Sequence, residues 1–529
     1  MNQRPTQTLD FWQSKYQVTD QAIEALYNKF LESGEPAFVD EVGLFFVQQA
    51  IEAEEQAIRA ELQQGKIYHI DLSYEVGDQL IFPHLDYLIG TVASIKPGYN
   101  PSDGDFSILE VTFDDRNHTT AKFAADFRSH HILSSTYEEE AGDGGASEVQ
   151  KIYGKYQRVI RSKVTQGLQQ NDEFVHCDSQ WFLTDLLIDV PVGLLNIVDA
   201  AIDINAGPLN VDALIEQLEL QKNGKITDAA RFSVNHRLEN DPRFFNVGTE
   251  QHVLWYLDRL KPPQVIAAPH NLVVDDQLSF DPITLPGDLT VFLSEIDDEN
   301  TPPEFLKSAS DKEVTFVLNY PHRRSGTLPV LPAVRQLLPD NNDALLTLQL
   351  IDSQSGEKIL TWYVDQYNYI YGLGDWYQKY QLPVGTFITL KKTDDPLEFI
   401  VEFAPQRTRQ EWVRVVTVRN NQLAFQMRKR AISCSYDELM ILGEEGSEAV
   451  DALWKKVERN GTPLYTLLVN IFPELVKLSS QSAVHIKTVY SAINVVKRCP
   501  PGPLLQELSK HPSFVWMGHG YWTYKPSAK

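Results

Sequence analysis

The chain has 529 residues, more than a single hydrophobic core usually organises, and at roughly 150 residues per domain we expect roughly three to five domains. A hydrophobic fraction of 43% with 11% aromatic residues is ordinary for folded domains and excludes a largely disordered protein. The formal net charge of −25 argues against a protein that coats nucleic acid indiscriminately, because such binding depends on Lys and Arg neutralising phosphates. Any contact with nucleic acid should therefore be local.

The sequence shows no sign of membrane insertion or of a metal centre. No run approaches the roughly 18 apolar residues of a membrane span, and the opening MNQRPTQTLDFW lacks the apolar core of a signal peptide. We therefore expect a cytoplasmic protein without a membrane partner. Cys177, Cys434 and Cys499 are too far apart for a CxxC pair, so we expect them to be buried and reduced. No cofactor and no metal ion are expected.

Three regions precede residue 190. Residues 1–66 show two segments with helical spacing of apolar residues, joined by SGEPAFVDEV, and form either half of a helix-turn-helix or a plain helical packing element. Residues 67–135 change to short β segments, which predicts a small SH3-like barrel. His130 and His131 would point to opposite faces of a strand, so they should not bind a metal ion together. Residues 136–189 should be an acidic linker, YEEEAGDGGASE from Tyr137 to Glu148, followed by a helix.

Residues 190–261 have the pattern of a winged helix. VGLLNIVDAAIDINAGPLNVDALIEQL predicts two helices, ITDAARFSVNHRLEND predicts a third, and PRFFNVGTEQHVLWYLD predicts two strands around GTEQ. The third helix would offer polar side chains to a major groove: Arg231, Asn235, His236 and Arg237. The opening and RLENDPRFFNVG resemble the HARE-HTH family, whose members in the delta subunit of bacterial RNA polymerase and in restriction or chromatin proteins accompany DNA transactions. Because this copy is acidic, the resemblance implies contact either with DNA or with a protein.

Residues 446–529 repeat this pattern. TPLYTLLVNIFPELVKL, VHIKTVYSAINVVKR and PGPLLQELSKHP predict three helices, and FVWMGHGYWTY predicts a hairpin. The ending SKHPSFVWMGHGYWTY resembles that of the HARE-HTH family. From Glu448 to Lys529 there are ten Lys or Arg against five Asp or Glu, so we expect this end to bind DNA. The expected contact residues are Lys487, Lys497, Arg498, Lys510, His519 and Lys525.

The middle of the chain predicts a connector and then a β domain. Residues 262–312 are rich in Pro and acidic residues, and we expect a partly extended connector that adds a strand or two. Residues 313–445 alternate apolar and polar residues in at least five runs, which predicts a closed or nearly closed barrel with trailing strands. The elements SGTLPV, LLPD, LQLIDSQSGEKILTWYV, GLGDWYQKYQL and LPVGTFITLKK resemble, in order and spacing, the plant B-three pseudobarrel and the target-recognition domains of some restriction endonucleases.

This resemblance implies two arms that grip the major groove of DNA. The first arm would carry His322, Arg323, Arg324 and Ser325, and the second arm Gln366, Tyr367 and Asn368. Arg can read guanine and Gln or Asn can read adenine. Against this, Asp365 places a negative charge in the second arm, and the two arginines could instead pair with acidic neighbours. A further basic cluster, Arg428 to Arg430, is of a kind that is usually only solvated.

The expected fold class is therefore multidomain α+β, with a small SH3-like β barrel, two winged helix-turn-helix domains and a central β pseudobarrel. No GxGxxG, Walker, HExxH or GxSxG motif is present, so we do not expect an enzyme. We expect a multidomain protein that binds double-stranded DNA, for transcription or for recognition of modified or foreign DNA, through the pseudobarrel arms and the basic C-terminal winged helix. The alternative is an acidic adaptor that docks on RNA polymerase or another protein. The sequence does not predict the oligomeric state.

Overall fold

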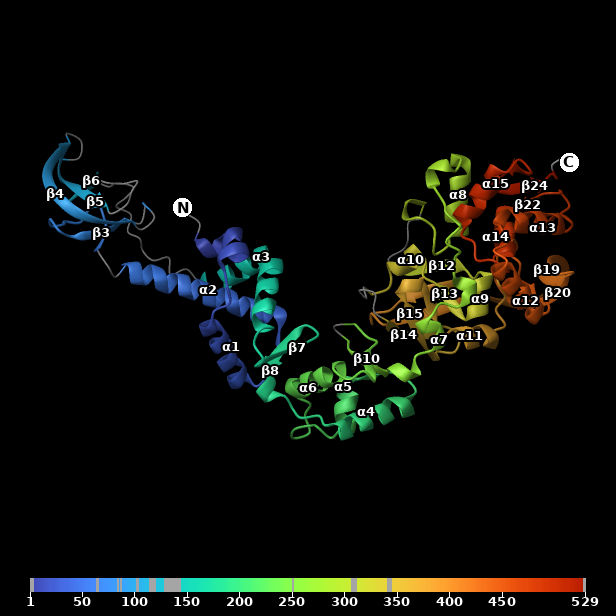
Figure 1. The fold of residues 1–529 in the computed structure, drawn as a ribbon, viewed down its shortest axis with the longest axis horizontal. Helices are drawn as coiled ribbons and strands as arrows, with labels where there is room; N and C mark the ends of the chain where they lie inside the picture. The colour runs from blue at the N-terminus through green and yellow to red at the C-terminus, as the bar shows by residue number, and fades with distance from the viewer. Residues whose placement is uncertain are drawn as a thin grey trace. The chain divides into compact units, whose positions relative to one another are not determined.

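The structure, a computed structural model, describes residues 4–62, 66–82, 85, 88–100, 104–113, 120–127, 144–249, 252–305, 312–339 and 345–526. The chain divides into two compact units, the first formed by Met1–Val190 with Leu220–His236 and the second by Pro191–Glu219 with Arg237–Lys529. The described residues form helices and six separate sheets, so the predicted α+β class is confirmed (Figure 1).

The first unit is built on three long helices and a three-stranded antiparallel sheet of order β1-β8-β7. Its elements are η1 (Pro5–Gln7), η2 (Phe11–Lys15), α1 (Asp20–Ser33), β1 (Ala37–Phe38), α2 (Val39–Leu62), α3 (Gly144–Leu168), β7 (Phe174–Cys177), β8 (Gln180–Leu183) and η4 (Thr184–Leu186). Helix α1 begins where the side chain of Thr19 accepts a hydrogen bond from the N–H of Ala22, at 3.2 Å. Trp12, Phe46 and Trp181 are buried in one core between these elements.

The regions 1–66 and 136–189, expected to be separate, share this core. Phe30 of α1 lies 6.2 Å, centroid to centroid, from Phe174 of β7. Helix α3 already begins at Gly144, so the expected linker is wrong for residues 144–148, because the sequence that follows buries Ile152 and Ile160 at helical spacing. The rest of the linker, with His130 and His131, lies outside the described residues.

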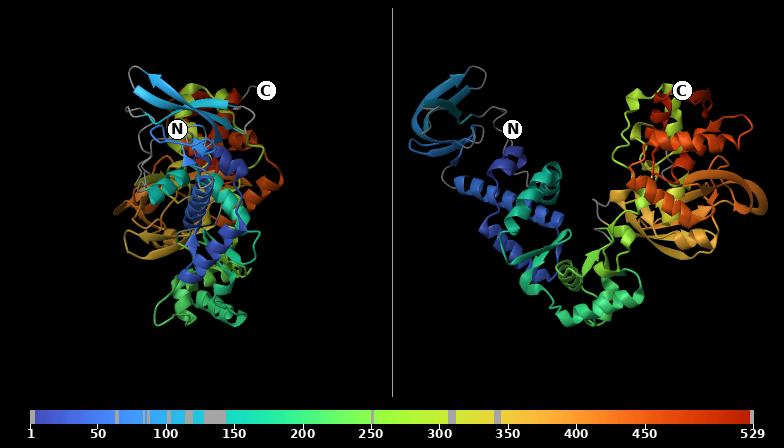
Figure 2. Two further views of the ribbon diagram at one scale, coloured as in Figure 1. Left: turned by 90° about the vertical axis from the view of Figure 1, so that its left-hand side faces the viewer. Right: turned by 45° about the vertical axis from the view of Figure 1, so that its right-hand side comes forward.

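A second sheet of the first unit stands between α2 and α3 along the chain. Its strands pair in chain order: β2 (Lys66–Ile67), β3 (Gln79–Phe82), β4 (Leu88–Asn100), β5 (Gly104–Phe113) and β6 (Thr120–Ala125). Figure 2 shows β4 and β5 as long, bent strands. The sheet has its own core, which includes Tyr68, Leu80 and Leu109. The predicted small β region is confirmed, and its likeness to an SH3 barrel stays a prediction.

The second unit opens with helices and a three-stranded sheet of order β10-β11-β9. The elements from here to the connector are α4 (Val192–Asn205), β9 (Leu209–Asn210), α5 (Val211–Gln217), β10 (Phe244–Asn246) and β11 (Leu254–Leu257), with α6 (Asp228–Glu239) between α5 and β10 along the chain. The side chain of Asn210 accepts a hydrogen bond from the N–H of Ala213 at 2.8 Å, which starts α5.

The connector is helical rather than extended. It contains η5 (Asp258–Leu260), α7 (Pro263–Ile266), η6 (His270–Leu272), η7 (Pro282–Thr284), α8 (Gly287–Ile296) and η8 (Pro303–Phe305). The described residues of 262–312 contain no strand, so the expected strand or two is wrong there. Leu289, Phe292 and Leu293 explain the helix, because they place one apolar side of α8 in the core of the second unit.

The central β region is a curled, seven-stranded half-barrel. Its strand order is β12-β17-β18-β14-β15-β16-β13, and every pair is antiparallel except β14 with β18. The strands are β12 (Glu313–Val317), β13 (Thr327–Pro329), β14 (Leu346–Asp352), β15 (Lys358–Val364), β16 (Tyr369–Tyr371), β17 (Phe387–Lys392) and β18 (Glu398–Phe403). Short helices join them: α9 (Tyr320–Ser325), α10 (Pro332–Arg335), η9 (Asp365–Tyr367) and α11 (Gly374–Lys379). The predicted strands are confirmed, although the end strands β12 and β13 do not pair to close a barrel in the described residues.

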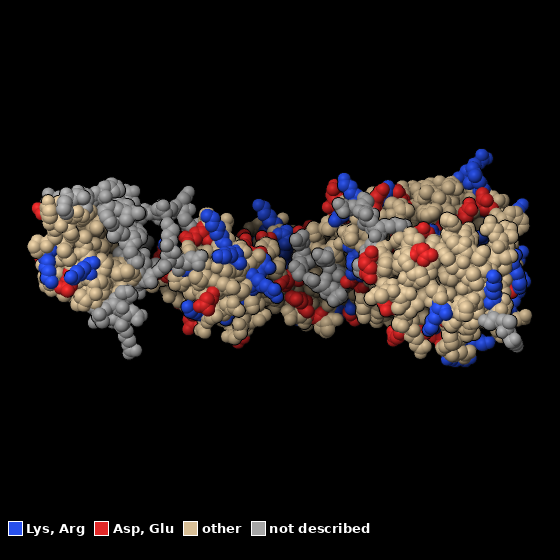
Figure 3. Space-filling model, turned by 90° about the horizontal axis from the view of Figure 1, so that it is seen from above, with Lys and Arg blue, Asp and Glu red and all other residues tan. Residues whose placement is uncertain are grey.

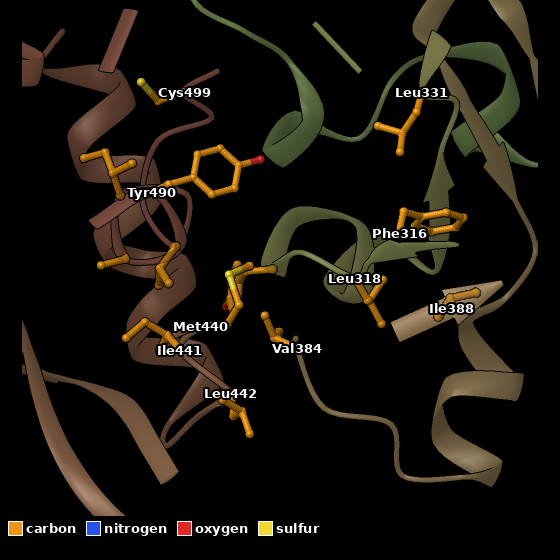
Figure 4. Packing of buried hydrophobic residues seen from close by; sticks show 14 of the residues in the cluster. Phe316, Leu318, Leu331, Val384, Ile388, Met440, Ile441, Leu442, Tyr490 and Cys499 are labelled. Carbon is orange, nitrogen blue, oxygen red and sulfur yellow. The ribbon is translucent and has the colours of Figure 1, made fainter. Parts of the chain in front are cut away.

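The expected trailing strands form a sheet of their own. β19 (Pro405–Arg419) and β20 (Gln422–Cys434) make a long antiparallel hairpin, to which β21 (Gly443–Glu444) adds beside β19. The elements after it are α12 (Ser447–Arg459), α13 (Leu464–Val476), β22 (Val484–His485), α14 (Ile486–Ile493), α15 (Pro501–Lys510), β23 (Phe514–Gly518) and β24 (Tyr521–Tyr524). One core joins these helices to the half-barrel, and Figure 4 shows Met440 and Ile441 between Val384 on one side and the helix of Tyr490 on the other.

The same order of elements occurs three times along the chain. Each occurrence has a helix, a two-residue strand directly before a second helix, a third helix, and a hairpin whose last strand lies in the middle of the sheet. The first repeat runs from α1 to β8, the second from α4 to β11, and the third from α13 to β24. The sequence predicted the second and third repeats, and it missed the first.

Equivalent residues hold equivalent places in the three repeats. A buried Trp on the last strand pairs with the two-residue strand each time: Trp181 with Ala37, Trp255 with Leu209 and Trp522 with Val484. Each hairpin begins with a buried Phe whose N–H donates to the carbonyl three residues earlier, and these bonds, of Phe174, Phe244 and Phe514, measure 3.2, 3.1 and 3.0 Å. The repeats therefore agree in strand register as well as in the order of elements.

Candidate nucleic-acid interface

The expected first arm is a short buried helix, α9. Pro321 stands in its first turn, and the side chain of Asn319 accepts a hydrogen bond from the N–H of His322 at 3.1 Å, so PHRRS becomes helical. His322 is only 1% exposed, and its ring nitrogens lie 2.8 Å from Thr327 Oγ1 and 3.1 Å from Glu299 Oε1. The prediction that His322 contacts DNA is therefore corrected, because its ring is enclosed by the protein. Ser325 donates to Asn271 Oδ1 at 3.0 Å and is half-buried.

The two arginines of α9 differ in their partners. Arg324 is exposed and pairs with Asp451 at 2.8 Å and with Glu444 at 3.5 Å, so the alternative of acidic neighbours holds for this residue. Arg323 donates from Nε to the carbonyl of Leu382 at 2.6 Å, and its guanidinium lies 5.4 Å from the ring centre of Tyr377. Arg323 forms no ion pair with any of the described residues.

The expected second arm is fixed to the half-barrel. Arg335 donates to the carboxylate of Asp365 and to the side chain of Asn368, which has a positive φ of 56°. Tyr367 stacks on Tyr369 with ring centres 6.0 Å apart. Asp365 is thus neutralised, and Gln366 is the exposed side chain of this arm. Arg323 and Arg324 line a common pocket, and no residue of the second arm is among the described residues that line it.

The polar residues of α6 are half-buried. Arg231 pairs with Asp228 one turn earlier at 2.6 Å, and the ring of His236 stacks on Phe232 with centres 6.1 Å apart. Asn235 and Arg237 are also half-buried. The contact of these four residues with DNA stays a prediction.

Carboxylates of the connector and of the loop before the C-terminal region pair with three of the ten Lys or Arg in this region. Arg498 is buried and donates to Asp298 at 2.7 Å, to Glu299 at 2.6 Å and to Asn494 at 3.0 Å. Two lysines pair in the same way, Lys497 with Asp275 at 2.6 Å and Lys487 with Asp437 at 3.0 Å. The expectation that Arg498 meets DNA is corrected, because its side chain is enclosed by the protein. Carboxylates distant in the sequence hold Lys487 and Lys497, and their contact with DNA stays a prediction. Lys510, His519 and Lys525 are exposed.

A stronger concentration of positive charge lies on β19 and β20, which we call the basic ribbon (residues 405–434). The ribbon holds seven Lys or Arg against one acidic residue, Glu411, a formal charge of +6. Six of these cations are exposed: Arg407, Arg409, Arg419, Arg428, Lys429 and Arg430. Figure 3 shows Lys and Arg side chains at the edge of the second unit on which Figure 1 places the ribbon.

Few carboxylates offset the ribbon's charge. Glu445 lies 3.2 Å from Arg428 and 3.3 Å from Arg430. Within the described part of the chain, Arg407 and Arg409 form no ion pair, and the same holds for Lys429. The basic ribbon therefore has cations available to neutralise phosphates.

An aromatic side chain stands among these cations. Trp412 is 60% exposed and lies directly opposite Lys429 in the strand register, with the Lys429 ammonium 5.6 Å from its ring centre. Met427, on the same face of the hairpin, is also exposed. An exposed tryptophan beside cations is suited to contact with a nucleic acid or a protein.

A pocket of about 760 Å³ lies between α9 and the inner side of the ribbon. We call it the arginine pocket, because Arg323, Arg324 and Arg430 line it. Its apolar lining comes from several strands and loops, and includes Leu382, Val384, Val413, Val415, Ile432 and Leu442. Glu444, also in the lining, accepts a hydrogen bond from the Tyr320 hydroxyl and pairs with Arg324.

Sequence reasoning missed Arg407, Arg409, Trp412 and Arg419 as site residues. The signal was present in PQRTRQEWVRVVTVRNNQLAFQMRKR, where the basic residues lie on two strands joined by Asn420 and Asn421. Counting charge over the long C-terminal segment pointed instead to residues that ion pairs neutralise.

No family model matches the chain, and comparison with curated proteins and with solved structures also gives no match. None of the described helices combines the length and apolar character needed to cross a lipid bilayer. Cys177, Cys434 and Cys499 are buried, as predicted, and form no disulfide within the described part of the chain.

Proposed function

We propose that this protein is a non-enzymatic, double-stranded DNA-binding protein and that the basic ribbon is its main contact. The observation that supports this proposal is the ribbon's formal charge of +6 in a chain whose net charge is −25, with six of its cations exposed. Binding that depends on phosphate neutralisation needs such a local concentration of Lys and Arg.

The ribbon's shape suits the major groove, which admits a two-stranded β ribbon as well as a helix. Arg407 and Arg409 lie on the exposed first part of β19. Arg428 to Arg430 belong to β20 and lie opposite residues 411–413 of β19. Cations on both strands can reach the two phosphate backbones that border a groove. Arginines that reach base edges would add sequence preference, since Arg reads guanine bidentately.

The rest of the chain supplies domains of a kind that accompany DNA transactions. We propose that the three repeats are winged helices of the HARE-HTH type and that the half-barrel is a relative of the B-three pseudobarrel. The exposed Lys510, His519 and Lys525 of the third repeat would make a second, weaker contact with the duplex. The role would be transcription or recognition of modified or foreign DNA, in the cytoplasm.

The test is fluorescence anisotropy of a labelled duplex titrated with the full chain at several salt concentrations. We expect the logarithm of the binding constant to fall linearly with the logarithm of salt concentration, with a slope of about 0.9 per phosphate neutralised. The double variant Arg409→Gln with Lys429→Gln should lower the affinity at low salt and reduce the slope by about 2.

A charge-matched control is the double variant Lys358→Gln with Lys391→Gln. Both lysines belong to the half-barrel and already pair with carboxylates, Lys358 with Glu398 at 2.5 Å and Lys391 with Glu402 at 2.7 Å. The control should bind the duplex like the unchanged protein. If both double variants lose the same affinity, the ribbon is not the interface and only the total charge matters.

A second candidate function, docking on a protein such as RNA polymerase, is favoured by the surface of α4. This helix of the acidic second repeat exposes Val192, Ile197 and Ile204 to 59%, 44% and 86%. Exposed apolar side chains of this size on one helix mark contact surfaces for proteins. A pull-down with the purified polymerase should recover the complex, and Ile197→Ser with Ile204→Ser should abolish it; equal recovery by this variant would exclude α4.

A further inference from the structure

We infer that the arginine pocket binds a mononucleotide, with its phosphate on the arginines and its base against the apolar lining. This inference does not rest on the duplex contact proposed for the basic ribbon, although the pocket and the ribbon share Arg430. The volume of about 760 Å³ lies within the range of roughly 300–1,000 Å³ that is usual for sites of small ligands.

Arg323 is the residue that points most directly to an anionic ligand. Burial lowers the pKa of Arg323, which means that its charged form is poorly solvated. The guanidinium of Arg323 donates from Nε to the carbonyl of Leu382, and Arg323 forms no ion pair with the described residues, although Glu444 lies near enough to act on its charge. A half-buried guanidinium without a paired carboxylate loses part of its solvation, and an anion in the pocket would offset that loss.

Arg324 and Arg430 enlarge the positive site. Arg324 stands next to Arg323 on α9, and Arg430 comes from β20, so guanidinium groups reach the pocket from two separate elements. Each keeps only part of its donors occupied, Arg324 on Asp451 and Glu444, and Arg430 on Glu445 at 3.3 Å. Guanidinium groups bind phosphate through paired N–H donors, so several of them favour a phosphate over a single carboxylate.

The remaining lining is too extended for an anion alone. Val413 and Val415 of β19 face the pocket together with Ile432 of β20, and these buried side chains offer an apolar wall. Gln378 and Gln381 also line the pocket, and an amide can both donate to and accept from the edge of a base. A phosphate joined to a flat, polar-edged ring matches this combination.

The shared chemistry has two possible sources, a free mononucleotide and the phosphorylated end of a nucleic acid chain. Arg430 belongs both to the pocket and to the basic ribbon, which places a chain end within reach of the site. The two sources present the same phosphate on ligands of different size. Competition between a mononucleotide and a short nucleic acid strand for the pocket therefore distinguishes them.

The test is isothermal titration calorimetry of the full chain with each of the four ribonucleoside 5′-monophosphates, with adenosine, and with inorganic phosphate. We expect at least one mononucleotide to bind at least tenfold more tightly than adenosine and inorganic phosphate. Arg323→Gln should weaken this binding at least tenfold, and Arg430→Gln should weaken it several-fold. Because Arg430 is exposed, that variant should fold normally even if Arg323→Gln does not.

Arg419→Gln is the matched control, since Arg419 is an exposed arginine of the same ribbon and does not line the pocket. It should bind the mononucleotide unchanged. The inference is overturned if no mononucleotide binds more tightly than inorganic phosphate, or if Arg430→Gln and Arg419→Gln bind equally. If the unchanged protein binds the duplex but binds no mononucleotide, the pocket is rejected and the ribbon proposal stays in place.

A short single strand with a 5′-phosphate, compared with its 5′-hydroxyl form, identifies the source. Displacement of the mononucleotide by the phosphorylated strand alone supports the pocket as a site for chain ends. Displacement by neither strand supports it as a site for the free nucleotide. Equal displacement by both strands would contradict a phosphate-specific pocket.

Discussion

Arg498 Nη2 lies 2.7 Å from Asp298 Oδ2 in the interior of the second unit, although the two residues are 200 positions apart. Both side chains are fully buried, and the Tyr490 hydroxyl donates to the same Asp298 oxygen at 2.5 Å. Burial would raise the pKa of the adjacent Glu299, but Arg498 and His322 hold it well below its ordinary value. This network ties the connector, α9 and the third repeat together.

Removing Arg498 should therefore destabilise the second unit strongly. We expect Arg498→Met to lower the free energy of unfolding by roughly 3–5 kcal/mol, because it leaves Asp298 and Glu299 buried without their cation. Lys358→Met, which removes the cation of an exposed pair, should cost less than about 1 kcal/mol. Urea unfolding followed by tryptophan fluorescence gives both values. In the double variant Arg498→Met with Asp298→Asn the loss should be smaller than the sum of the single losses. Additive losses would show that the two side chains are not coupled.

The stability of the second unit should fall as the pH is lowered from about 6.5 toward 4. Burial lowers the pKa of His485 to about 4, and Lys487 adds to the effect. His485 Nδ1 accepts a hydrogen bond from the N–H of Lys487 at 3.2 Å at the start of α14, which requires an unprotonated nitrogen. The unfolded chain, with an ordinary histidine pKa, takes up the proton first, so stability is level above about pH 6.5 and declines by up to about 1.4 kcal/mol per pH unit below it.

The measurement is the unfolding midpoint between pH 5 and 7 for the unchanged protein, for His485→Gln and for His519→Gln. The decline should be shallower in His485→Gln, while the exposed His519 should contribute nothing. An identical pH dependence in all three proteins would remove His485 as its cause.

Particular residues show how far the sequence could predict this fold. The sequence predicted the central strands from their alternating apolar and polar residues, and it predicted the hairpin that contains Trp522. Both predictions depend only on residues close together in the sequence. The first repeat was missed since a five-stranded sheet stands between α2 and α3, so Trp181 lies far from β1 in sequence although it pairs with it. Only the fold brings such residues together.

The candidate site was predictable in part for a similar reason. Arg428 to Arg430 stood out as a local cluster, but the partner of Arg498 lies on another segment and no spacing reveals it. His322 was expected to be exposed because PHRRSG is polar, whereas the Asn319 cap folds it into a buried helix. Charge in a sequence indicates where cations are, and ion pairs decide which of them remain available.

Two tryptophans should separate stability from binding. Trp412→Ala, at a largely exposed position, should change the free energy of unfolding by less than about 0.5 kcal/mol and should weaken duplex binding several-fold. Trp255→Ala, at a buried position of the second repeat, should cost roughly 3–5 kcal/mol. Chemical denaturation and anisotropy measured on the same preparations provide the comparison. Unchanged duplex binding by Trp412→Ala would place the tryptophan outside the interface.

Gly326 should be far less replaceable than Gly356, although both have a positive φ, of 66° and 72°. A Cβ at Gly326 would lie 2.9 Å from the backbone nitrogen of Gly374, whereas a Cβ at Gly356 would meet nothing within 4 Å. Gly356→Ala should therefore cost only the backbone strain of about 1–2 kcal/mol, and Gly326→Ala should lose a further 1–3 kcal/mol or so because the neighbouring backbone must move. Gly326 ends α9, so its replacement should also displace Arg323 and weaken mononucleotide binding, while Gly356→Ala should leave that binding intact. Equal unfolding midpoints for the two variants would show that the close approach of Gly326 to Gly374 is not a constraint on the fold.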